Sequence, residues 1–166
     1  MELTTNMKQR LPRLVSSLCI PAVVLMILAV LGERPRLLAQ DAGSSLTIRI
    51  VGAKSSKGQI AIAVFNGEAG FPGDKSKTVR TLQAGIDPQT LIAQVTLKNL
   101  PRGVYAVSVF HDENMNGRLD KNVLGIPKEG YGASNNPGKS MGPPKFAEAK
   151  FQLDQPEEVI EIKLLY

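Results

Sequence analysis

The sequence has few of the side chains that most often carry redox, nucleophilic or metal chemistry. Its 166 residues include one cysteine, one histidine and no tryptophan, and aromatic residues make up only 5% of the chain. A single histidine without cysteine partners cannot build a zinc site of the usual kind. Function must therefore rest on carboxylates, amides, hydroxyls and a small number of rings.

The charge balance excludes a further class of function. Twenty basic and 15 acidic residues give a net charge of +5, but residues 1–39 alone carry five basic residues and two acidic ones. The remaining chain is close to balanced and lacks the concentrated basic stripe that a nucleic-acid surface needs. Its length and its 43% hydrophobic content suit one ordinary globular domain.

The N-terminal segment has the pattern of an export signal. Three basic residues within the first 13 precede an apolar run over residues 14–31, and small residues follow. We predict a cleaved signal peptide over residues 1–39, with an uncleaved signal-anchor helix as the alternative because the run could cross a bilayer. The rest of the chain is then periplasmic or secreted, or is held at the membrane by this segment alone. Cleavage would remove Cys19, leaving no disulfide and no thiol nucleophile.

After a polar linker over residues 40–45, the chain reads as all-β. Short runs of alternating apolar and polar residues are separated by clusters of Gly, Pro, Asn and Asp, and no convincing amphipathic helix is present. The expected strands cover residues 46–50, 59–65, 77–82, 91–97, 104–110, 146–153 and 158–166. We predict an antiparallel β-sandwich of about seven strands over residues 46–166, with one long loop over residues 112–145.

The sharpest local pattern lies at the start of this loop. Residues 112–120 have the D-x-[DN]-x-[DN]-G spacing of a calcium loop, in which alternate side chains turn their oxygens inward and glycine allows the reversal. The predicted ligands are the side chains of Asp112, Asn114, Asn116 and Asp120 and the backbone carbonyl of Arg118. Val123 replaces the bidentate Glu and no helix flanks the loop, which excludes an EF-hand. The alternative is an ion-free turn stabilised by its own side chains.

A second set of residues could form a ligand surface in the same loop. His111 directly follows a strand and precedes a carboxylate, so it could act as a general base or ligand, or could pin the loop to the strand. Tyr131 and its polar neighbours have a composition common in sugar- or peptide-binding surfaces, although the ring could also be a packed anchor. The predicted ligand surface comprises His111, Glu129, Tyr131, Ser134, Asn135 and Asn136.

Several of these motifs together resemble the bacterial DUF2141 family. They are Leu100-Pro101-x-Gly103-x-Tyr105, His111-Asp112-x-Asn114-x-Asn116-Gly117, and Gly125-Ile126-Pro127-x-Glu129-Gly130-x-Gly132-x-Ser134-Asn135-Asn136. The resemblance covers roughly residues 46–165 and implies a small exported protein of a family without known activity. The first motif is also similar to a turn in transthyretin-like and carboxypeptidase-regulatory-like sandwiches, which implies a transthyretin- or Ig-like fold.

Two classes of function follow from these observations. The first is a non-enzymatic module of the cell envelope, whose partner is an envelope protein or a glycan and whose loop over residues 112–136 binds a ligand or is ordered by calcium. The alternatives are a hydrolase or transferase that uses His111 with neighbouring carboxylates, and a carbohydrate-binding module. An enzyme requires a concave pocket where His111 and a carboxylate converge. A module is expected to bury His111 against the sheets.

Overall fold

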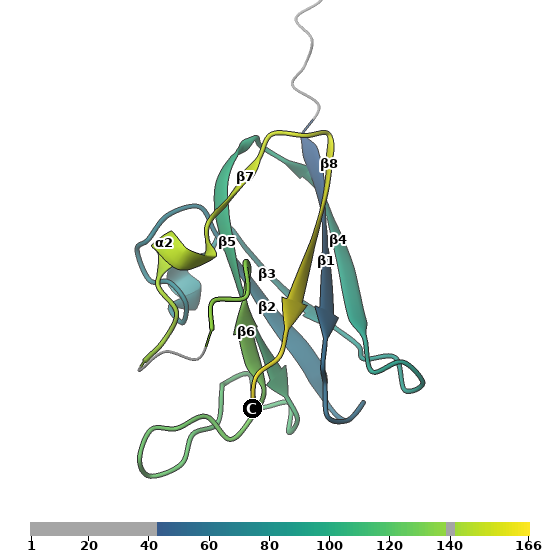
Figure 1. Cartoon of the computed structure of the whole chain (residues 1–166), viewed down its shortest axis with the longest axis vertical. Helices are drawn as coiled ribbons and strands as arrows, with labels where there is room; N and C mark the ends of the chain where they lie inside the picture. The colour runs from purple at the N-terminus through teal and green to yellow at the C-terminus, as the bar shows by residue number, and fades with distance from the viewer. Residues whose placement is uncertain (1–42, 139–141) are drawn as a thin grey trace, which may run out of the picture. The chain divides into compact units, whose positions relative to one another are not determined.

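The structure, a computed structural model, describes residues 43–138 and 142–166 (Figure 1). The export segment predicted over residues 1–39 lies outside the described residues, as do residues 40–42 of the predicted linker. Within the described ranges, no helix is long and apolar enough to cross a membrane.

The first sheet is built around β1 (Ser44–Val51). Leu46, Ile48 and Ile50 alternate with polar residues along this strand, so one face is apolar and fully buried. β1 pairs antiparallel with β4 (Ala93–Leu100) and parallel with β8 (Glu157–Lys163). The expectation of purely antiparallel pairing is therefore wrong for β1 and β8. The whole second sheet separates these two strands in sequence, which provides the long crossover that parallel pairing requires.

The second sheet is antiparallel and carries the candidate site. Its strand order is β3-β2-β5-β6, and β7 pairs with the beginning of β5. The strands are β2 (Gln59–Phe65), β3 (Arg80–Ala84), β5 (Gly103–Asp112), β6 (Tyr131–Ala133) and β7 (Phe151–Leu153). β5 is the longest described strand and pairs with three others. The long loop begins at its C-terminal end.

The two sheets share one apolar core. Residues of the first sheet, such as Ile48 and Ile162, belong to the same buried cluster as Ile62, Val107 and Val109 of the second. β6 also lies beside the chain that follows β8, where Tyr131 and Leu165 exchange two backbone hydrogen bonds of 2.9 and 2.8 Å. The all-β prediction is confirmed, because two sheets enclose this core.

The strand predictions succeed best where alternation is regular. The strands expected at 46–50, 59–65 and 104–110 lie within β1, β2 and β5, and those at 77–82, 91–97 and 158–166 overlap β3, β4 and β8. The strand expected over 146–153 is wrong in its first half, where α2 (Phe146–Ala149) forms a helical turn instead. Ala and Glu favour a helix there, and the Glu148 carboxylate accepts the N–H of Lys145 at 3.0 Å. β6 was not predicted, because three residues around a glycine are too few for alternation to be visible.

The irregular segments gather around one face of the second sheet. The η1 turn (Lys75–Lys77) ends the loop after β2, and α2 precedes β7. Phe71 packs edge-on against Phe65 and Phe146, with ring centroids 5.2 and 5.8 Å apart, which holds both irregular stretches against β5. In Figure 1 the long loop after β5 and the C-terminal end of the chain lie at the same end of the molecule.

Candidate functional site

The candidate site begins where β5 ends. His111 and Asp112 are the last two residues of the strand, and both are fully buried. Their ladder partners on β2 are Ile60 and Gln59. The side chains of His111 and Asp112, both predicted as functional residues, are therefore buried inside the fold.

Asp112 organises the first turn of the loop. Its Oδ1 accepts the backbone N–H of Asn116 at 2.9 Å, and its Oδ2 accepts that of Gly117 at 2.9 Å. Gln59 Nε2 also donates to Oδ2 over 3.4 Å. Gly117 has φ of 76°, the left-handed conformation in which glycine is least strained. A carboxylate loses its bound water on burial, which is very unfavourable in free energy. These donors compensate for that loss.

Three further residues of the predicted calcium loop meet beside this turn. The Nδ2 groups of Asn114 and Asn116 donate to the two oxygens of Asp120, over 2.8 and 3.0 Å. The side-chain oxygen of Asn114 accepts the N–H of Asn116 at 3.1 Å, and that of Asn116 accepts the N–H of Arg118 at 2.8 Å. The structure thus brings all five predicted positions into one turn. Within the described ranges, no three His, Cys, Asp or Glu side chains are grouped closely enough to hold a metal ion.

Glu129 closes the loop from its far end. The side chain is buried, and its two oxygens accept the backbone N–H groups of Glu113 at 3.0 Å and Asp120 at 2.9 Å. In the described part of the chain, neither Asp112 nor Glu129 has a Lys or Arg within the 4.0 Å of an ion pair. Backbone amides therefore solvate both acids. Glu129 was predicted on a ligand surface, but its oxygens face the interior of the loop.

His111 is held by hydrogen bonds on both ring nitrogens. Nε2 lies 2.7 Å from the carbonyl oxygen of Lys57, and Nδ1 lies 2.7 Å from the hydroxyl of Tyr166. A carbonyl oxygen can only accept, so Nε2 carries the proton, and in the neutral ring Nδ1 accepts from the hydroxyl. The hydroxyl in turn accepts the backbone N–H of Lys54 at 3.0 Å. Both nitrogens of the imidazole therefore form hydrogen bonds within the fold.

The environment of Tyr166 suits this donor role. Burial raises the pKa of its hydroxyl, the carboxylates of Glu113 and Glu129 add to the rise, and the N–H of Lys54 opposes it. The hydroxyl is therefore protonated at neutral pH. The ring also requires a glycine at position 130, because a Cβ atom there would lie 2.5 Å from it. Sequence reasoning missed Tyr166, since nothing in the local pattern relates a residue at position 166 to a histidine 55 positions earlier.

The polar residues after β6 tie chain segments together. Ser134 is fully buried; its Oγ accepts the N–H of Val107 at 2.9 Å and donates to the carbonyl of Ala149 at 2.6 Å. Asn135 Nδ2 donates to the carbonyl of Lys150 at 2.8 Å. Asn136 bonds β8 at two points, the carbonyl of Glu161 (2.9 Å) and the N–H of Lys163 (2.7 Å). All three were predicted on a ligand surface, yet their polar groups serve the fold.

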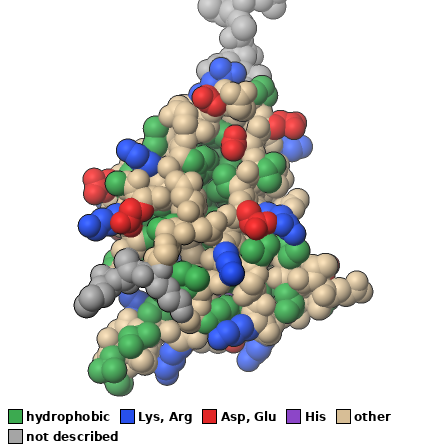
Figure 2. Space-filling view, in the orientation of Figure 1, with side chains coloured by type: hydrophobic (Ala, Val, Ile, Leu, Met, Phe, Trp, Pro, Cys, Tyr) green, Lys and Arg blue, Asp and Glu red, His purple; other side chains and the backbone are tan. Residues whose placement is uncertain are grey.

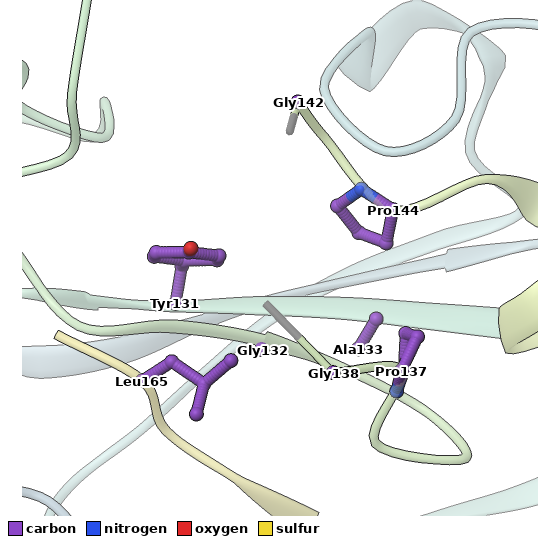
Figure 3. Close-up of a pocket in the computed structure, with 8 residues that line it drawn as sticks. All are labelled: Tyr131, Gly132, Ala133, Pro137, Gly138, Gly142, Pro144 and Leu165. Atoms are coloured by element: carbon purple, nitrogen blue, oxygen red, sulfur yellow. The ribbon is translucent and has the colours of Figure 1, made fainter. Parts of the chain in front are cut away.

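Tyr131, the remaining member of that predicted surface, is half-buried. It projects from β6 to the side on which Gly142 and Pro144 lie (Figure 3). The small pocket drawn there has a volume of about 20 Å³. A space of that size holds about one water molecule, so it is too small for a ligand.

A much larger groove lies over the outer face of the second sheet. Its volume is about 970 Å³, at the upper end of what small-molecule and oligomer sites require. The floor is lined by the short outward-facing side chains of Ala61, Ala63 and Ser108, and the rings of Phe110 and Tyr131 line it as well. Small side chains on two paired strands leave this space, and sequence alternation alone did not identify it because it could not place the loops that form the walls.

The groove is basic. The described residues that line it include Lys75, Arg118 and Lys121 and no acidic residue. The Lys75 ammonium donates to the carbonyl of Gly117 and lies 5.8 Å from the centroid of the Phe110 ring, so it ties η1 to the loop. The same loop after β2 is also fixed to the floor of the groove, because the Ser108 hydroxyl donates to the carbonyl of Pro72 at 2.8 Å. Basic side chains also gather along the lower edge of Figure 2, the end at which Figure 1 places the long loop.

Comparison with known families matches most of the chain. The model of a family described as "Uncharacterized protein conserved in bacteria (DUF2141)" matches residues 48–161. No curated protein and no solved structure matches the chain. The matched range begins within β1, ends within β8 and contains the whole second sheet and the whole long loop.

The two hydrogen bonds that Glu129 accepts from backbone N–H groups provide a first test of its role in closing the loop. Glu129→Gln replaces one acceptor by an N–H group that faces another N–H, so we expect the free energy of unfolding to fall by about 2 kcal/mol. Hydrogen exchange should accelerate at the amides of Glu113 and Asp120 in particular. The control is Glu157→Gln on the exposed edge of β8, expected to change stability by less than about 0.5 kcal/mol. Equal effects of the two variants would contradict the assigned role of Glu129.

The His111–Tyr166 pair provides a second test, based on pH. Tyr166→Phe removes the donor to Nδ1 and should lower the free energy of unfolding by about 1–2 kcal/mol at pH 7. The folded-state pKa of Tyr166 is raised, so the stability it contributes is complete below the unfolded value of about 10 and is lost as pH rises through the folded value. Urea unfolding of the two proteins should therefore converge in alkali. Tyr105, whose pKa is also raised by burial, is present in both. A difference that stays constant from pH 7 to 11 would refute this assignment.

Proposed function

The chain belongs to the bacterial family of uncharacterised proteins DUF2141, and we propose that it is a non-enzymatic binding module exported to the cell envelope. Its ligand occupies the groove over the outer face of the second sheet. Export rests on the N-terminal basic and apolar pattern, which also leaves a membrane anchor as the alternative. We further propose a transthyretin- or Ig-like sandwich, supported by two sheets around one core.

The bonds of His111 favour a module over a hydrolase or transferase. A general base needs a nitrogen that can reach a substrate proton, whereas both nitrogens of His111 are bonded and the ring is fully buried. Residues 138–142 read Gly-Lys-Ser-Met-Gly, a G-x-S-x-G pattern, but Ser140 lies outside the described residues. Such a motif also depends on a strand-to-helix turn of an α/β sheet, which an all-β fold does not supply.

The groove carries the proposal, and its chemistry favours an acidic glycan. Arg118 and Lys121 are exposed side chains on its loop wall, and no described acidic residue lines it. Guanidinium and ammonium groups bind carboxylates by charge-assisted hydrogen bonds. The rings of Phe110 and Tyr131 provide flat apolar surface beside these charges, and a sugar ring carrying a carboxylate complements both features.

This proposal predicts binding of an oligogalacturonide and not of a maltooligosaccharide of equal length. In calorimetric titrations of the full chain, Arg118→Gln and Lys121→Gln should each weaken binding about tenfold, because each removes one charge-assisted contact. Lys98→Gln, an exposed residue of β4 in the other sheet, is the matched control and should leave the affinity unchanged. Equal affinity for the neutral sugar, or unchanged affinity in both loop variants, would reject the acidic-glycan ligand.

Calcium ordering of the loop is a second candidate, favoured by one observation. The side chains of Asn114 and Asn116 both reach the carboxylate of Asp120, so three predicted ligands already converge. Rotation of the two amides by 180° would turn oxygens toward Asp120 and would break the bonds that these oxygens now accept from the N–H groups of Asn116 and Arg118. A cation would then be required to offset the repulsion among them, as oxygen-rich calcium sites do.

The calcium proposal is tested by thermal unfolding of the full chain. With an affinity of about 1 mM, typical of weak extracellular sites, about 10 mM calcium should stabilise by roughly 1.4 kcal/mol and raise the Tm by roughly 4 °C. Magnesium should have little effect, and Asp120→Asn should abolish the response while leaving the buried Asp112 in place. A wild-type Tm that does not move with calcium would eliminate this candidate.

A further inference from the structure

The far end of the long loop is a tight turn over residues 121–127. Lys121 and Pro127 form a β-bridge, and the N–H of Asn122 donates to the carbonyl of Ile126 at 2.8 Å. The carbonyl of Asn122 accepts the N–H of Gly125 at 2.9 Å. Gly125 has φ of 76°, which allows the chain to reverse there. The turn is therefore closed by its own hydrogen bonds and projects from the sheet as a preformed unit.

The side chain of Asn122 satisfies further backbone groups within this turn. Its Oδ1 accepts the N–H of Leu124 at 2.9 Å and that of Ile126 at 3.0 Å. Together with the backbone bonds, this pairs the N–H groups of residues 122, 124, 125 and 126. Unpaired backbone N–H and C=O groups are costly in an apolar medium, so the bonds that Asn122 accepts lower the cost of bringing this turn into one.

The side chains that this turn presents are apolar and solvent-exposed. Val123, Leu124 and Ile126 have relative exposures of 102%, 79% and 56%, and we refer to these three residues as the apolar tip. The corresponding lower-left extremity of Figure 2 is covered by hydrophobic side chains. Large hydrophobic residues this exposed at a projecting turn mark a site of interaction with another surface.

The charges around the apolar tip are basic. Arg118, Lys121 and Lys128 are exposed and flank the turn on both sides. The nearby acids are engaged: Glu129 is buried, and the Asp120 carboxylate accepts the amides of Asn114 and Asn116. An incoming surface would therefore meet three apolar side chains whose most exposed charged neighbours are basic.

We propose that the apolar tip inserts into the surface of a lipid bilayer that carries anionic headgroups. Apolar side chains enter the boundary between headgroups and acyl chains, while neighbouring Lys and Arg attract the negative surface. The self-bonded backbone is what distinguishes this turn from an ordinary exposed loop. A stable protein interface needs a patch of about 800 Å² per partner, which three side chains on a narrow turn do not provide.

A position-specific probe tests this proposal in the full chain. Leu124→Cys in a Cys19→Ser background is labelled with an environment-sensitive nitrobenzoxadiazole group and mixed with phosphatidylglycerol-containing vesicles. We expect a blue shift of emission and loss of quenching by iodide. The same label at Val159→Cys, a position 67% exposed on β8, should stay accessible to iodide. Because the N-terminal segment is present in both proteins, it cannot produce a difference between the two positions.

Charge and tip variants separate insertion from other contacts. With the label at Val123→Cys, Leu124→Asp should abolish the shift, and Val159→Asp should leave it intact. Lys128→Gln should lower the inserted fraction about fivefold at limiting lipid, and pure phosphatidylcholine should give a much weaker signal. A label at position 124 that stays accessible to iodide with phosphatidylglycerol vesicles would overturn the proposal. A shift that appears without lipid, through self-association, would overturn it as well, as would suppression of the shift by free glycerol phosphate.

Discussion

The burial of two carboxylates that have no Lys or Arg partner among the described residues is the constraint on which the long loop depends. Asp112 and Glu129 accept four backbone N–H groups between them, from residues 113, 116, 117 and 120. A buried charge is very unfavourable unless such donors replace water. The chain from residue 113 to residue 120 must therefore take a path that aims these amides inward, and that path positions the loop wall of the groove and the base of the turn that carries the apolar tip.

Alternation predicted the strands whose two faces differ most in burial. β1, β2 and β5 each carry apolar residues at every second position, because one face lies on the shared core. The same pattern holds no information on strand direction, so the parallel pairing of β1 with β8 could not be predicted from it. Nor could it resolve α2 and β6, which are four and three residues long, since a period needs more positions to be recognised.

The site was predictable only in its local part. The D-x-N-x-N-G spacing of residues 112–117 did indicate a turn in which side-chain oxygens accept backbone amides, and the structure has these bonds. The direction of His111 and Ser134 was not predictable, because it depends on partners distant in sequence. The imidazole of His111 is hydrogen-bonded to Tyr166 and Lys57. The hydroxyl of Ser134 is hydrogen-bonded to Val107 and Ala149. A polar residue at a strand end thus carries no sign of whether it faces solvent.

The same burial leaves basic side chains as the most exposed charged groups of the loop. Residues 112–129 include four acidic and three basic residues, so the sequence alone describes a slightly acidic segment. Asp112 and Glu129 are buried, however, whereas Arg118, Lys121 and Lys128 are exposed. Asp112 and Glu129 accept backbone N–H groups inside the loop, and Glu113 and Asp120 are half-buried, so the most exposed charged groups of the loop are basic. A loop held rigidly by internal hydrogen bonds also loses little conformational entropy on binding, which lowers the cost of an encounter. Acids that fix the backbone and bases that face outward are therefore two parts of one arrangement, and this arrangement supports the binding role that we propose for the loop.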